Sequence, residues 1–163
     1  MMFVAAAAMM FASCEKDGAD LEDNQLFYDG KVYNLVSSAT SDADGSYVSF
    51  DAVGREVLVQ LSGVLEKECF NRTFNLAVAA DDVHYNIDCW CDELGLTFSF
   101  DNNRGTFHGG MVGVPEGESI FSKGTCTITY DNDEFSITLD GTLKNNKKLA
   151  FEIDVPKSQI QIN

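Results

Sequence analysis

The segment 84–90 carries the side chains that are best suited to bind a ligand. Positions 84, 86, 88 and 90 are His, Asn, Asp and Trp, and the residues between them are Tyr, Ile and Cys. Alternate residues of a strand point to opposite faces, so these side chains would share one outward face. An indole ring can stack on a sugar while amide and carboxylate neighbours bind its hydroxyl groups. The pattern predicts a candidate ligand-binding face made of Trp90, His84, Asn86 and Asp88.

Packing offers another explanation for Trp90. The indole ring could instead lie beneath a loop or between two layers of sheet, where a large aromatic side chain buries much apolar area. Both interpretations require Cys89 and Cys91 to face the core.

The cysteines Cys69, Cys89, Cys91 and Cys126 could form disulfides or remain buried thiols. Residues two apart on a strand are separated by ~6.6 Å between Cα atoms, the upper limit for a disulfide, so Cys89 and Cys91 should not bond to each other. Four thiols leave three full pairings open. Free cysteine also packs as a small apolar residue.

A zinc site at His84, Cys89 and Cys91 is disfavoured by the spacing. The two thiols form a C-x-C pair with no second pair of ligands nearby, and His84 would point to the other face of the strand. We therefore expect no metal and no cofactor here.

The sequence contains no recognisable catalytic constellation. His108-Gly109-Gly110 is similar to the oxyanion-hole segment of lipases, but the accompanying G-x-S-x-G nucleophile motif is absent. Neither of the two histidines has a Ser or Cys beside it. A polysaccharide hydrolase needs only two carboxylates beside one cleft, and 26 acidic residues leave that hypothesis open.

Two acidic segments, 42–45 and 131–134, could offer oxygen ligands to calcium. An EF-hand loop starting at Asp42 would need Glu at its twelfth position, which is Val53. Ordinary turns, in which Asp and Asn bind their own backbone, explain both segments.

Apolar and polar residues occupy alternate positions through most of the chain, a pattern that predicts β-strands. Turn-forming Asp, Asn and Gly residues separate the runs, as at Asp29-Gly30. The expected strands are 25–29, 31–38, 46–53, 56–62, 73–79, 83–90, 95–101, 105–114, 124–131, 134–143 and 147–155, with a helical turn near 64–70. About ten short strands, each with one solvent-exposed face, predict an all-β fold. Within that class we expect an antiparallel β-sandwich. A lipocalin-like β-barrel is the alternative.

The composition fits one soluble domain, which we place at residues 25–163. The chain has 163 residues, of which 45% are hydrophobic, and a formal net charge of -15. Because a polyanion repels phosphate backbones, the charge argues against nucleic-acid binding.

The N-terminal residues 1–13 form an uncharged, largely apolar leader that is too short to span a membrane and suits a secretory signal peptide. Phe11-Ala12-Ser13-Cys14 resembles the lipobox of bacterial lipoproteins, which implies cleavage before Cys14 and lipid attachment to it. No Lys or Arg precedes Lys16, which indicates an upstream start or a weak signal.

Residues 14–24 carry five acids and one base, which predicts a disordered tether. Glu15-Lys16-Asp17 is similar to the export signal of outer-surface lipoproteins in the Bacteroidetes. The stretch 135–155 resembles the closing hairpin of small uncharacterised lipoproteins from that group. Together these resemblances imply a lipid anchor in the outer membrane with the domain at the cell surface, or alternatively on the periplasmic face.

Three functions follow as hypotheses. The leading one is a non-enzymatic binding module for a glycan or a protein partner. A second is a barrel that carries a small apolar ligand among inward Phe98, Phe100 and Phe151. The third is a polysaccharide hydrolase.

Overall fold

The structure is a computed structural model that describes residues 21–78, 85–91, 96–101, 106–108, 119–131 and 134–163. No α-helix occurs among these residues, and two short 3₁₀ turns, η1 (Lys67–Cys69) and η3 (Lys157–Gln159), accompany the strands. The strands are β1 (Gln25–Tyr28), β2 (Lys31–Ser41), β3 (Tyr47–Gly54), β4 (Gln60–Glu66), β5 (Arg72–Asn75), β6 (Tyr85–Cys91), β7 (Leu96–Asp101), β8 (Thr106–His108), β9 (Phe121–Tyr130), β10 (Glu134–Leu143), β11 (Lys148–Pro156) and β12 (Gln161–Ile162).

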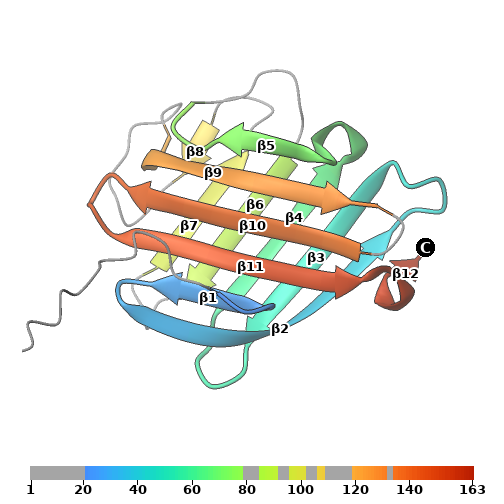
Figure 1. Ribbon diagram of the computed structural model, residues 1–163, viewed down its shortest axis with the longest axis horizontal. Coiled ribbons are helices and arrows are strands. Elements are labelled where there is room, and N and C mark those ends of the chain that lie inside the picture. The colour runs from blue at the N-terminus through green and yellow to red at the C-terminus, as the bar shows by residue number, and fades with distance from the viewer. Residues whose placement is uncertain (1–20, 79–84, 92–95, 102–105, 109–118, 132–133) are drawn as a thin grey trace, which may run out of the picture.

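The strands form two layers that are joined through one shared strand. The hydrogen-bonded order is β5-β9-β10-β11-β1-β2-β3-β4-β6-β7-β8, and every one of these pairs is antiparallel. Residues 31–34 of β2 pair with β1, whereas residues 35–41 pair with β3. We call the part from β5 to β1 layer A and the part from β3 to β8 layer B. In Figure 1 the strands of layer A cross obliquely over those of layer B.

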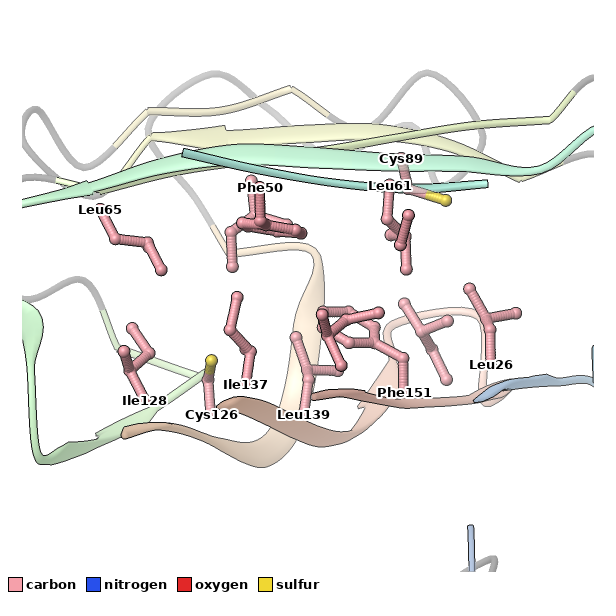
Figure 2. Packing of buried hydrophobic residues seen from close by; sticks show 14 of the residues in the cluster. Leu26, Phe50, Leu61, Leu65, Cys89, Cys126, Ile128, Ile137, Leu139 and Phe151 are labelled. Atoms are coloured by element: carbon pink, nitrogen blue, oxygen red, sulfur yellow. The ribbon is translucent and has the colours of Figure 1, made fainter. Parts of the chain in front are cut away.

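The core fills the space between the layers because both inner faces carry the apolar half of each alternating run. Figure 2 shows Phe50, Leu61 and Leu65 of layer B pointing toward Ile137 and Phe151 of layer A. All five side chains are fully buried. Burial of a side chain of this size contributes about 1.5–3 kcal/mol to folding.

The hairpin between β1 and β2 confirms the turn that Asp29-Gly30 predicts. Asp29 has φ 49° and Gly30 has φ 84°, so both central residues are left-handed, as in the two-residue turn that suits the twist of antiparallel strands. The carboxylate of Asp29 also forms an ion pair with the ammonium group of Lys147 in the adjoining turn, with 2.8 Å between Oδ2 and Nζ.

The expectation for 56–62 and 64–70 is partly wrong. Strand β4 begins at Gln60 and continues to Glu66, and only Lys67–Cys69 form a 3₁₀ turn. Residues 55–59 instead make a tight turn closed by the hydrogen bond from Gly54 N to Val59 O at 2.8 Å. The apolar alternation runs through both segments, so periodicity alone could not locate the turn.

The expected all-β antiparallel fold is thus confirmed, as one curled sheet whose two facing layers fit either the sandwich or the barrel-like alternative. The remaining strands match the expected ranges to within a few residues at their described ends. The expected strand 105–114 is described only at 106–108. Short β12, which pairs in parallel with Thr40 and Ser41 of β2, was not expected. No helix within the described ranges is long and apolar enough to cross a membrane.

Candidate ligand-binding face

The outward-pointing residues of β3, β4 and β6, together with those in residues 35–41 of the shared strand β2, form one continuous surface, which we call the outer face of layer B. Strand β4 lies between β3 and β6, so its residues fix the register of both neighbours. Gln60 stands opposite Trp90 and Val53, and Ser62 stands opposite Asp88 and Asp51.

The alternation expected for β6 holds for the residues whose side chains are described. Ile87 and Cys89 are buried in the core, whereas Trp90 is 44% exposed and Asp88 is half-buried. The expected outward direction of Trp90 and Asp88 is therefore confirmed. Asn86 pairs with Val64 in the ladder, but its side chain, like all of His84, lies outside the described residues.

Trp90 lies at one end of a row that runs across the strands and is apolar except for the amide of Gln60. The row passes from Val36 through Val53 and Gln60 to Trp90, following the cross-strand pairs. All four side chains are exposed. Three strand spacings separate Val36 from Trp90, which makes the row about 14 Å long.

A polar row lies directly beside the apolar one. It contains Ser38, Asp51, Ser62 and Asp88 in consecutive pairing positions. Asp51 and Asp88 flank Ser62 on its two sides, so their backbones are about 10 Å apart. Carboxylate and hydroxyl oxygens at this spacing can accept hydrogen bonds from several hydroxyl groups of a ligand lying on the adjoining row.

The same face is hollowed at the opposite end of β3 and β4. A hollow of about 430 Å³ is lined by Ser46, Tyr47, Val64, Glu66, Lys67 and Glu68. Tyr47 is 37% exposed and stands opposite Glu66. The hollow thus offers an aromatic ring and an exposed valine beside two carboxylates and one ammonium group.

The acidic turn 42–45 positions Tyr47 at the edge of this hollow. Asp42 accepts hydrogen bonds from Gly45 N through its backbone oxygen and from Tyr47 N through Oδ1, both at 3.1 Å. Asp44 Oδ1 accepts a further bond from Ser46 N at 3.1 Å. Both carboxylates therefore bind the backbone of their own turn, which is the ordinary turn chemistry that the sequence favours.

The described thiols belong to the core. Cys69, Cys89 and Cys126 are buried thiols. Burial raises the pKa of Cys69 to about 11 and that of Cys126 to about 12, and the neighbouring Cys69 contributes to the latter shift. Such thiols remain protonated at neutral pH and are poor nucleophiles. The side chain of Cys91 lies outside the described residues, among which no group of three His, Cys, Asp or Glu residues could hold a metal ion.

Sequence reasoning found Trp90 and Asp88 but missed Tyr47, Gln60 and Asp51 as parts of the same face. These residues come together only because β3 and β6 both pair with β4, although β5 intervenes in sequence between β4 and β6. The alternation of side chains indicated which residues of each strand are exposed. Nothing in the sequence indicated the order in which the strands pair.

Comparison of the chain with models of known protein families, with curated proteins and with solved structures found no match in any of the three. A functional conclusion must therefore come from the chemistry of the outer face of layer B.

Proposed function

We propose that the protein is a non-enzymatic binding module, lipid-anchored at Cys14 in the outer membrane, that binds a neutral glycan on the outer face of layer B. The observation that carries the proposal is the exposed indole of Trp90 beside the polar row that contains Ser62 and Asp88. Sugars present both C–H faces and hydroxyl groups, and this pairing of an aromatic ring with oxygen acceptors complements both.

The charge of the chain selects among glycans. With a net charge of -15, and with Asp51 and Asp88 on the face itself, the protein repels uronate or sulfate groups. Neutral sugars lack that penalty and offer many hydroxyl donors to the two carboxylates. A neutral polysaccharide is therefore the ligand class that fits.

A protein partner is the second candidate, because Val36, Val53 and Val64 are exposed on the same face. Exposed apolar patches commonly mark interaction surfaces. The polar row beside Val36 and Val53 favours the glycan, because that row carries hydroxyl and carboxylate groups rather than apolar side chains.

The two other hypotheses gain less support from the described residues. An apolar-ligand carrier would need an interior cavity, but Phe50, Phe121, Phe135 and Phe151 occupy the described space between the layers. The side chains of Phe98 and Phe100 lie outside the described residues. A hydrolase could use Glu66 and Glu68 of the hollow, yet Glu68 is exposed and Glu66 only half-buried, whereas a general acid requires an apolar surrounding.

The test is to screen the purified protein on an array of neutral and anionic glycans and to measure the binding of any hit by calorimetry. Trp90→Ala should lower the affinity by about tenfold or more, because tryptophans that a ligand covers commonly contribute much of the binding energy. Trp90→Phe, which keeps an aromatic ring, should retain part of the affinity that Trp90→Ala loses. Val32→Ala, an exposed position on β2 beside β1, is the matched control. An unchanged affinity in Trp90→Ala contradicts the proposal, and release of reducing ends from a hit would indicate the hydrolase instead.

A further inference from the structure

Trp90 and Tyr47 lie at opposite ends of the outer face of layer B, on the two strands that flank β4. Trp90 is opposite Gln60 at the start of β4, and Tyr47 is opposite Glu66 at its end. Six residues of strand separate the two positions along β4, which corresponds to about 20 Å, and two strand spacings add about 10 Å across it. A single pyranose ring is far too short to reach both aromatic side chains.

The surface between the two rings carries small side chains. Ser62 and Val64 of β4 and Ser49 of β3 occupy it, and Ser49 is tied to Thr40 by a hydroxyl hydrogen bond of 3.1 Å. Because serine and valine stand lower above the sheet than indole or phenol rings, the face between Trp90 and Tyr47 can accommodate a flat ligand. The alternation of Ser62 and Val64 along β4 presents a hydroxyl group and then an apolar contact to it.

The hollow gives the second ring a defined contact site. Tyr47 and Val64 line its apolar part, and Glu66, Lys67 and Glu68 supply polar groups around them. Its volume of about 430 Å³ falls in the range of small-ligand pockets. The hollow therefore combines an aromatic ring with carboxylate groups, as the other end of the face does with Trp90 and Asp88.

We propose that the outer face of layer B binds an extended chain of a neutral polysaccharide, which runs obliquely across β4 from Trp90 to the hollow at Tyr47. This inference rests on the proposed function and adds that the site recognises several consecutive sugar units within a polymer. A free monosaccharide would occupy only one of the two aromatic positions.

The experiment measures affinity against ligand length. The purified protein is titrated with neutral β-linked oligosaccharides of glucose, xylose and mannose, from the monosaccharide to the hexasaccharide, and with oligogalacturonates as the anionic series. For a series that binds, affinity should increase steeply with length until the chain spans both rings. Tyr47→Ala should lower hexasaccharide affinity by about tenfold and leave disaccharide affinity unchanged. Tyr47→Phe, which keeps the ring, should behave like the parent protein.

The outcomes separate this inference from the proposed function. If Trp90→Ala weakens every ligand but affinity stops rising at the disaccharide, or Tyr47→Ala has no effect on the hexasaccharide, the extended chain is excluded and the glycan site at Trp90 remains. If no neutral oligosaccharide binds, or the anionic series binds more tightly, both proposals fall and the protein partner is favoured. Because Tyr47 is exposed, Tyr47→Ala should fold normally, and Val64→Lys provides a second variant that obstructs the same hollow.

Discussion

Single residues on layer A show that the acidity of this chain affects its stability. Glu152 on β11 lies opposite Gln25 and Thr138. Burial raises the pKa of Glu152, and the carboxylates of Asp23 and Asp154 raise it further. The pKa of Asp154 is raised by the same causes, burial first and then Asp23. Ionised at neutral pH, these side chains repel one another on a partly desolvated surface, so each opposes folding.

Replacement of Glu152 by Gln should therefore stabilise the protein at pH 7. We expect Glu152→Gln to increase the free energy of unfolding by about 0.5 kcal/mol, since single charge–charge interactions on a partly exposed surface, here with Asp23 and Asp154, are of this order. A folded-state pKa above the unfolded value means that the penalty exists only where the carboxylate is ionised. The gain should accordingly disappear below about pH 4, where both states are protonated.

Urea unfolding curves at pH 7 and at pH 3.5 would measure the effect of Glu152→Gln. Glu56→Gln, at an exposed position in the turn before β4, removes one negative charge from a turn outside the Asp23, Glu152 and Asp154 group and serves as the control. A destabilised Glu152→Gln protein at pH 7 would show that a hydrogen bond of the carboxylate outweighs the repulsion.

Strands were predictable because their side-chain alternation is a local property of the sequence. The expected strands 134–143 and 147–155 match β10 and β11 to within one residue at each end, and Phe135, Ile137 and Leu139 are buried as expected. The pairing order is not local. Strand β5 joins β9 in layer A although it follows β4 of layer B, and nothing in residues 72–75 indicates which layer they enter. The Tyr47 end of the outer face of layer B was missed because it, too, depends on how the strands pair.

A close approach between β9 and β10 explains two glycines that alternation alone would not require. Gly124 pairs with Gly141, and the register shifts shortly afterwards between Thr142 and Leu143. A Cβ atom on Gly141 would lie 2.6 Å from Cδ1 of Phe121 and 3.1 Å from Cδ1 of Leu76. Phe121 is fully buried, so its ring has little space into which to move.

Gly141→Ala should consequently lower the free energy of unfolding by about 1–3 kcal/mol, the usual cost of overpacking a core. Thermal and urea unfolding of the variant would measure this. In the background Phe121→Leu, which removes the contacting ring atoms, the same substitution should be less destabilising. An equal loss in both backgrounds would indicate that the Phe121 ring is not what excludes a side chain at position 141.

The position of the whole domain relative to a membrane depends on the point at which the chain leaves the sheet. Asn24 O accepts a hydrogen bond from Leu35 N at 2.8 Å, and its Oδ1 accepts one from Asp154 N at 3.1 Å. The chain is therefore held to layer A from Asn24 onward. Nine residues lie between Cys14 and Asn24, and the disordered tether that the sequence predicts there would have a reach of roughly 15–20 Å.

An acylated Cys14 would keep the domain within this distance of the membrane surface. Two or three acyl chains, at about 0.8 kcal/mol per buried CH₂, give an anchor that does not dissociate in practice. Produced with its leader in a lipoprotein-processing bacterium, the chain should begin at Cys14, have the mass of an acylated protein and partition into detergent. Cys14→Ser should abolish all three properties, whereas Ser13→Ala, which keeps a small residue before the cleavage point, should retain them. A mature protein that starts at Met1 and remains in the aqueous phase would contradict the anchor, because the apolar leader would then belong to the protein itself.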